Sequence, residues 1–138
     1  MTAPAPALVI DMDGTLLRTD TLLEAALALL AAEPWRLAEL LSWLRHGRAG
    51  FKARLAAARL ARPETLPVNE NVRAAVEAAR AEGRRVELVS AADHRQAAAV
   101  AAHLGLFDAV HGTGGPGVTG NLSGARKAAF LVARFGRG

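Results

Sequence analysis

Two aspartates one residue apart are the side chains of this sequence best placed to do chemistry. Asp11 and Asp13 follow directly on the apolar run 7–10, and Gly14 comes next. In an extended chain, the side chains at positions i and i+2 point the same way. Like charges at that spacing repel unless a cation, a shared proton or water compensates them. The pattern therefore predicts a nucleophile, a general acid/base and a Mg²⁺ site in one place.

The run Asp-Met-Asp-Gly-Thr-Leu at 11–16 resembles the first motif of the haloacid dehalogenase (HAD) superfamily, most of whose members transfer phosphoryl groups. The resemblance implies that Asp11 is the nucleophile, which attacks phosphorus and forms an aspartyl-phosphate. It also implies that Asp13 is the general acid/base. Because the dehalogenases of the family lack the second acid, Asp13 favours phosphate chemistry. The alternative is an acidic turn that occurs by chance, since a short motif needs its structural context.

Two further residues match later motifs of the same superfamily. Ser90 matches the second motif, whose hydroxyl hydrogen-bonds a phosphoryl oxygen; the alternative is a serine that satisfies a turn or caps a helix. Lys127 matches the third motif, whose ammonium group neutralises the nucleophile and the phosphoryl group; the alternative is a solvated helix lysine. The resemblance also implies that Gly14 and Thr15 help to bind the phosphate.

The acidic fourth motif, which completes the Mg²⁺ site in this superfamily, is missing, because no Asp or Glu follows Asp108. The resemblance leaves Asp11 and the backbone carbonyl of Asp13 to hold Mg²⁺, which prefers octahedral oxygen coordination. It also implies that a neighbouring strand is absent, so that the strand at 7–11 has an open hydrophobic edge that invites self-association. We therefore expect a truncated and impaired domain, or one that needs a partner.

Several longer runs resemble a narrower group, the HAD-like N-terminal domains that precede some UbiA-type membrane prenyltransferases. These runs cover 13–24, 51–55, 66–69, 102–108 and 121–124. In that group a polytopic prenyltransferase follows the domain, whereas no segment here is apolar and long enough to span a bilayer. Prenyl transfer is therefore not assigned to these residues, but a membrane prenyltransferase is an expected partner.

Alternating strand and helix patterns predict an α/β fold with a parallel sheet. The expected strands cover 7–11, 85–90 and 109–111, and the expected helices cover 21–32, 34–47, 49–61, 70–82, 93–104 and 127–135, with a glycine-rich loop over 112–124. We expect a HAD-like Rossmannoid core of about three parallel strands, formed by 7–16 and 69–138. The segment 17–68 is then a helical cap insert over the C-terminal end of the first strand.

Local signals predict where several helices begin, end and face. Thr21 and Glu24 have the spacing of a capping box, Asp93 is an expected N-cap, and Gly105 is an expected helix end. In the segment 34–47, four leucines form one apolar stripe expected to face the interior of the cap. These are Leu37, Leu40, Leu41 and Leu44.

Composition narrows the classes of function. The chain has no cysteine, which excludes disulfides, thiolate chemistry and cysteine-ligated zinc. The net charge is +4, but the arginines that dominate it are scattered and not interleaved with aromatic residues, so we expect no nucleic-acid partner. Residues 1–10 lack the pattern of a signal peptide, which favours a cytoplasmic location, with the inner face of the membrane as the alternative.

The sequence thus predicts a Mg²⁺-dependent phosphomonoester hydrolase of the HAD type that acts on a small phosphorylated substrate through an aspartyl-phosphate. The alternative is a non-catalytic HAD-like module, or the N-terminal part of a membrane prenyltransferase fusion protein. The sequence alone leaves open whether the domain is an enzyme.

Overall fold

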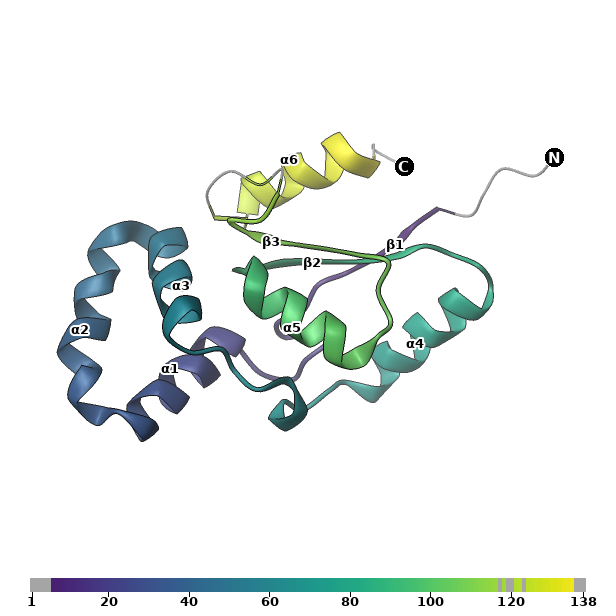
Figure 1. Ribbon diagram of the computed structural model, residues 1–138. Coiled ribbons are helices and arrows are strands. Elements are labelled where there is room, and N and C mark those ends of the chain that lie inside the picture. Colours follow the sequence, from purple (N-terminus) through teal and green to yellow (C-terminus); the bar gives the residue numbers. More distant parts are fainter. Residues whose placement is uncertain (1–5, 117, 119–120, 123, 136–138) are drawn as a thin grey trace.

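The computed structural model in Figure 1 describes residues 6–116, 118, 121–122 and 124–135. Its strands are β1 (Leu8–Ile10), β2 (Val86–Asp93) and β3 (Ala109–Thr113). Its α-helices are α1 (Thr21–Ala32), α2 (Leu37–Ser42), α3 (Gly47–Ala58), α4 (Glu70–Ala81), α5 (His94–Leu104) and α6 (Gly124–Phe135). Three short 3₁₀ helices are η1 (Pro34–Arg36), η2 (Trp43–His46) and η3 (Pro63–Thr65).

The three strands form one parallel sheet in the order β1-β2-β3, which confirms the predicted α/β fold. Ile10 pairs with Leu88, and Leu88 pairs with Val110. Helix α6 covers one face of the sheet, and α4 and α5 cover the other (Figure 1). Among the described strands β1 pairs with β2 alone, so it lies at an edge of the sheet.

The second and third strands are longer than predicted. The apolar pattern of β2 stops at Ser90, yet the strand continues to Asp93, and β3 continues to Thr113. Asp93 pairs with Thr113 after an irregularity in the register. Backbone pairing between polar residues leaves no hydrophobic pattern, so the sequence could not show these extensions. The predicted glycine-rich loop 112–124 lies partly outside the described residues.

Helix ends agree with the prediction where one side chain or glycine decides them. Asp93 caps α5 by accepting the backbone N–H of Arg95 at 2.9 Å. Gly105 ends the same helix with a φ of +66°, a conformation that glycine adopts without steric cost. Both predictions are confirmed.

The capping box predicted at Thr21 is wrong. The cap of α1 is Asp20, whose Oδ1 accepts the backbone N–H of Leu22 at 2.8 Å. Glu24 instead accepts the hydroxyl of Thr19 at 2.8 Å. The aspartate one residue earlier captures the free N–H groups of the first turn, so Thr21 becomes the first helical residue.

Helices α1, α2 and α3 lie beyond the carboxyl ends of the strands (Figure 1). The single helix predicted over 34–47 is instead η1, α2 and η2 in succession. Of its leucine stripe only Leu40 is buried, whereas Leu37, Leu41 and Leu44 are 49–58% exposed. A 3₁₀ helix has three residues per turn, so a stripe spaced for 3.6 residues per turn does not stay on one face.

The chain enters and leaves this helical segment through two adjacent linkers. Leu17 and Val68 form an antiparallel bridge. The backbone N–H of Arg18 donates to the carbonyl of Pro67 at 2.9 Å, and that of Asn69 donates to Leu16 at 2.8 Å. The chain therefore enters and leaves the segment 17–68 at adjacent positions.

One hydrophobic cluster runs through the helical segment and the sheet. Its buried side chains include Met12, Leu16, Leu17, Leu29, Leu40, Leu55, Leu66, Leu88 and Val100. A second, smaller cluster joins α4 to β2 through Val76, Ala79 and Val86. Burial of a leucine stabilises the fold by about 1.5–3 kcal/mol, so the shared cluster holds the two parts together.

A buried carboxylate on the central strand fixes α6 to the sheet. Glu87, whose side chain is 2% exposed, accepts a hydrogen bond from Arg134 of α6 and another from Arg85, each at 2.8 Å. Its Oε1 also lies 2.6 Å from His111 Nε2, and the His111 ring packs on Phe130 of α6. Burial would raise the pKa of Glu87, but these three hydrogen bonds together lower it to about 2.

We predict that Glu87→Gln lowers the free energy of unfolding at pH 7 by about 2–3 kcal/mol, because it removes a buried, hydrogen-bonded charge. The folded carboxyl has a pKa of about 2 against the ordinary 4.5, so its contribution is present above pH 4.5 and is lost as the pH falls toward 2. Urea unfolding followed by circular dichroism at pH 7 and pH 3 would measure both effects.

The matched control is Glu77→Gln, which removes an exposed pair with Arg73 and should change stability by about 0.5 kcal/mol or less. A difference between wild type and Glu87→Gln that stays constant across this pH range would contradict the assignment.

Candidate active site

The carboxyl end of β1 delivers both aspartates to the junction between the sheet and the helices α1 and α3. A hollow of about 330 Å³ opens there. It is lined by Asp11, Asp13, Asp20, Leu22, Lys52, Ala91, Ala92 and Lys127. Asp11, Asp13 and Lys127 therefore line the same hollow, although Lys127 is far from the two aspartates along the chain.

Asp11 and Lys127 form the central contact of this hollow. Lys127 Nζ donates to Asp11 Oδ1 at 2.6 Å, with the two side chains 24% and 39% exposed. Within the described residues the second carboxylate oxygen of Asp11 has no hydrogen-bond partner. The carboxylate is thus oriented by a cation on one oxygen and accessible on the other, which is the geometry of a nucleophile that must approach an anion.

Asp13 has a different environment. Its Oδ1 accepts the backbone N–H of Thr21, in the first turn of α1, at 2.8 Å. Burial raises the pKa of the Asp13 carboxyl above its ordinary value; hydrogen bonding by Thr21 partly opposes this, and nearby Asp20 and Asp11 add to it. A carboxyl that keeps its proton to higher pH than usual is suited to donate that proton.

The turn after the two acids depends on a glycine. Gly14 has a φ of +76°, a conformation that L side chains rarely adopt. Beyond it the N–H of Leu16 donates to the carbonyl of Asp11 at 3.2 Å, which folds the chain back toward α1. Gly14 and Thr15 are not among the described residues that line the hollow. Their contact with phosphate therefore stays a prediction.

Ser90 is fully buried and is likewise not among the described residues that line the hollow. Its hydroxyl accepts the backbone N–H of Ala92 at 3.0 Å. Its neighbours Ala91 and Ala92 do line the hollow, so the contact seen here holds that stretch of backbone in place. The role of Ser90 toward phosphate stays a prediction.

Sequence reasoning missed Lys52 of α3. Its Nζ donates to the carbonyl of Ala91 at 2.6 Å and to Asn121 Oδ1 at 2.5 Å. The hydroxyl of Thr113 also donates to Ala91, at 2.7 Å, and accepts the N–H of Leu122. One signal was available: the chain has only two lysines, and the other is Lys127.

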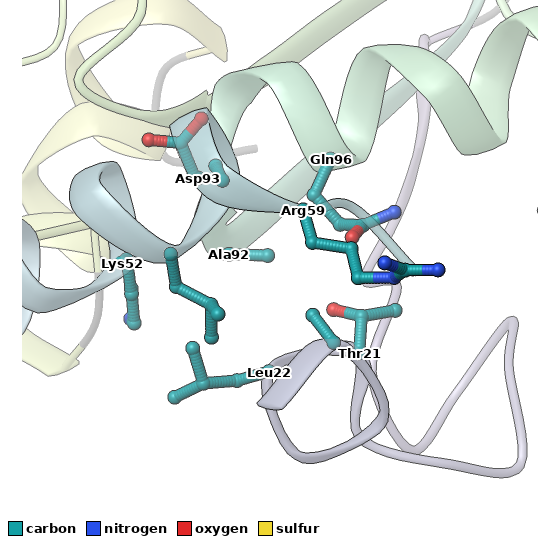
Figure 2. A pocket seen from close by; sticks show the side chains of 10 residues that line it. Thr21, Leu22, Lys52, Arg59, Ala92, Asp93 and Gln96 are labelled. Carbon is teal, nitrogen blue, oxygen red and sulfur yellow. The ribbon is translucent and has the colours of Figure 1, made fainter. Parts of the chain in front are cut away.

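A small cavity of about 20 Å³ lies beside the hollow, between α1, α3 and α5 (Figure 2). Its lining includes Thr21, Lys52, Ala92 and Gln96. The hydroxyl of Thr21 is buried there and has no hydrogen-bond partner among the described residues. A space of this size holds about one water molecule, so it does not admit a substrate.

Among the described residues that line the hollow, the evident donors for a metal are oxygen atoms. In the part of the chain that the structure describes, no three His, Asp or Glu side chains are grouped so that they could hold a metal ion. The carboxylate of Asp11 and the carbonyl of Asp13 are hard donors of the kind that Mg²⁺ accepts, with water or an anionic ligand in the remaining positions. The donor set present fits Mg²⁺ but is small.

Comparison with known proteins gives one family and one long relative. Residues 8–136 match the sequence model of the haloacid dehalogenase-like hydrolase (HAD) family. The chain is 35% identical over 132 residues to the uncharacterised protein y4nM of Sinorhizobium fredii, a match that covers 95% of this chain and 25% of y4nM. The chain therefore spans about a quarter of the length of this relative.

Two solved structures share the fold, each at 16% identity. A predicted phosphoglycolate phosphatase from Haemophilus somnus has a TM-score of 0.58, with 99% of this chain and 74% of that chain covered. A phosphoserine phosphohydrolase-like protein from Francisella tularensis has a TM-score of 0.51, with 78% and 58% covered. At this level of identity the likeness shows the fold alone.

We predict that Asp13→Asn raises the free energy of unfolding at pH 7, by about 1 kcal/mol, because it removes a buried charge and keeps an acceptor for Thr21. Since burial raises the pKa of Asp13 in the folded state, the ionised carboxyl costs stability above that pKa, and the gain disappears as the pH falls below 3.8. Urea unfolding at pH 7 and pH 3 measures the difference.

The control is Asp20→Asn, since asparagine caps a helix as well as aspartate does. A loss of stability in Asp13→Asn at pH 7 would show that the ionised carboxylate is favoured in the fold and would contradict the prediction.

Proposed function

This chain belongs to the haloacid dehalogenase-like hydrolase family, and we propose that it hydrolyses phosphomonoesters through a phosphorylated Asp11. The proposal rests mainly on one observation: Lys127 donates a hydrogen bond to Asp11, and both residues line the same hollow as Asp13. A carboxylate and a phosphate repel each other, and the ammonium group offsets that repulsion. Both solved relatives are named for hydrolysis of phosphomonoesters, which supports this substrate class.

In the first step the accessible oxygen of Asp11 attacks phosphorus. A bond forms between that oxygen and phosphorus, and the bond from phosphorus to the ester oxygen breaks. The departing oxygen takes the proton of Asp13 and leaves as an alcohol. The raised pKa of Asp13 supports this role, because its carboxyl takes up a proton more readily than an ordinary aspartate does.

In the second step a water molecule gives a proton to the Asp13 carboxylate, and its oxygen attacks phosphorus. The bond between Asp11 and phosphorus breaks, which releases inorganic phosphate. Asp11 is again a carboxylate paired with Lys127, and Asp13 is again protonated, so both groups return to their starting states. Ser90, Gly14 and Thr15 are proposed to contact the phosphate, as the family resemblance implies.

We propose that Asp11 and the backbone carbonyl of Asp13 hold Mg²⁺. When bound, the ion would neutralise charge on the transferring phosphoryl group. The described residues offer no group of three His, Asp or Glu side chains for a metal, so we expect weak binding completed by water and the substrate phosphate.

We also propose that residues 17–68 act as the cap of this site, with 7–16 and 69–138 as its core. Asp20, Leu22 and Lys52 from this segment line the hollow together with residues of the core. A wall from a separate segment excludes water from the reacting groups and selects the substrate.

Asp11→Asn should lower phosphatase activity about 1,000-fold or more, because an amide is not a nucleophile and does not pair with Lys127. Release of inorganic phosphate from phenyl phosphate with Mg²⁺ present measures the effect, and a chelator should lower the wild-type rate. Glu77→Gln, on the exposed face of α4, is the control and should keep the wild-type rate.

Equal rates for wild type and Asp11→Asn would remove Asp11 from the mechanism. A mass increase of one phosphoryl group on wild-type protein, but not on Asp11→Asn, would identify the covalent intermediate directly.

The second candidate is a non-catalytic or impaired module of a longer protein. It is favoured by the match to only 25% of the length of y4nM. From the sequence resemblance we propose a membrane prenyltransferase as the associated protein. We propose the cytoplasm, or the inner face of the membrane, as the location. Among the described residues no helix is long and apolar enough to cross a bilayer. Absence of phosphate release from any aryl phosphate would favour this candidate.

Self-association is the remaining proposal on partners. β1 has a hydrogen-bonded neighbour on one side only within the described strands, and its apolar residues Leu8, Val9 and Ile10 are partly exposed. An unpaired apolar strand edge pairs readily with another strand. The mass of the protein in solution at increasing concentration would decide this point.

A further inference from the structure

Lys52 is a partly buried cation whose ammonium group donates to neutral oxygens in the described part of the chain. These acceptors are the Ala91 carbonyl and the Asn121 side-chain oxygen. The Lys52 ammonium makes no ion pair among the described residues, whereas Lys127 pairs with Asp11. A partly desolvated ammonium group gains more from an anion than from amide oxygens.

The position of Lys52 joins the hollow of Asp11 to a second hollow of about 500 Å³. Asp20 and Leu22 line both hollows with it, so the two spaces share one wall. Figure 2 shows Lys52 on α3 and Leu22 on α1, at the edge of the small cavity described above. A ligand held at Asp11 would therefore extend past Lys52.

The second hollow combines a cation with apolar side chains. Arg48 lies four residues before Lys52, one turn earlier on α3, and lines this hollow with Leu44 and Phe51. Burial lowers the pKa of Lys52, and the charge of Arg48 reinforces this effect, so the two cations are close enough to repel. The charges of Asp13, Asp20 and Asp93 oppose the effect. An anion between them would relieve that repulsion.

Composition points to the same place. The chain holds 17 basic residues, of which only Lys52 and Lys127 are lysines, and both line the hollow of Asp11. A lysine presents a compact charge with three rotatable donors, whereas arginine presents a planar fork. Lys127 contacts Asp11, and Lys52 lines both hollows.

We propose that Lys52 and Arg48 are specificity-determining residues that bind a second anionic group on the alcohol part of the substrate. This inference rests on the proposed phosphatase function. The preferred substrate is then a phosphomonoester whose leaving alcohol carries a carboxylate or a further phosphate on an apolar framework. The apolar framework contacts Leu22, Leu44 and Phe51, and the second anion lies against the two cations.

The test compares matched substrates. Wild-type protein should hydrolyse 4-carboxyphenyl phosphate and 1,4-phenylene bisphosphate with a kcat/KM about 10-fold or more above that of phenyl phosphate, if both anions are accepted. Preference for only one of them identifies the carboxylate or the phosphate as the second group. Equal kcat/KM for all three substrates would overturn the inference.

The variants are Lys52→Met and Arg48→Met, with Arg54→Met as the control. Arg54 is an exposed cation on the same helix and lies outside both lining sets. Lys52→Met and Arg48→Met should remove most of the preference for the doubly anionic substrate through KM, and Arg54→Met should keep that preference. Arg48→Met, which is outside the hollow of Asp11, should change the rate on phenyl phosphate less than about threefold. If Lys52→Met does not fold, the exposed Arg48→Met decides.

A purely structural role for Lys52, as a tie between α3 and the sheet, would lower activity on all substrates equally and would overturn the inference. A binding measurement distinguishes failure of this inference from failure of the phosphatase proposal. Calorimetry with phenylphosphonate and 4-carboxyphenylphosphonate needs no turnover: tighter binding of the carboxylated ligand, lost in Lys52→Met, supports the inference even if no substrate is hydrolysed. Equal binding, or no binding of either ligand, overturns it.

Discussion

The ion pair between Lys127 and Asp11 is the contact on which the arrangement of the site depends. It joins the end of β1 to the first turn of α6 and orients one carboxylate oxygen while the other stays accessible. The pair exists only while α6 keeps its place on the sheet. Arg134, two helical turns after Lys127, secures that place by its hydrogen bond to the buried Glu87 of β2. The buried carboxylate of Glu87 thereby helps to position the ammonium group of Lys127 in the site.

The helical segment over the site is tied to the sheet by polar contacts as well as by the shared hydrophobic cluster. The guanidinium group of Arg95 donates to the Ala53 carbonyl at 2.7 Å, and Gln96 exchanges two hydrogen bonds with the backbone of Ala61. Lys52 adds a third connection, to Ala91. In the proposed mechanism the segment after β1 and helix α6 supply the reacting groups, and α1 and α3 supply the facing wall, so chemistry and substrate selection fall to different segments.

The sequence predicted those features that depend on residues close together in the chain. The acids at 11 and 13, the cap at Asp93 and the turn at Gly105 each follow from a local rule, and each lies where it was expected. The extension of β2 to Asp93 and the burial of Glu87 could not be predicted, because both depend on partners from distant elements. Lys52 was missed for the same reason.

In the helical segment 17–68, the hydrophobic periodicity of the sequence did not predict which leucines are buried. The leucine stripe of 34–47 assumed one continuous α-helix, and the 3₁₀ turns on either side of α2 leave most of it exposed. The capping signal at Thr21 was displaced by one residue because Asp20 competes for the same N–H groups. Local rules predicted that helices form in this segment, but they did not predict the lengths and buried faces of these helices.

The separation of the two charged partners along the chain has a consequence for synthesis on the ribosome. Asp11 is made early, and Lys127 follows 116 residues later. At about 5–20 residues per second, translation of that interval takes between about 6 and 23 seconds. Throughout it the nascent chain carries Asp11 without its partner Lys127. The ion pair therefore forms late, after the helix at 124–135 has emerged from the exit tunnel and docked on the sheet.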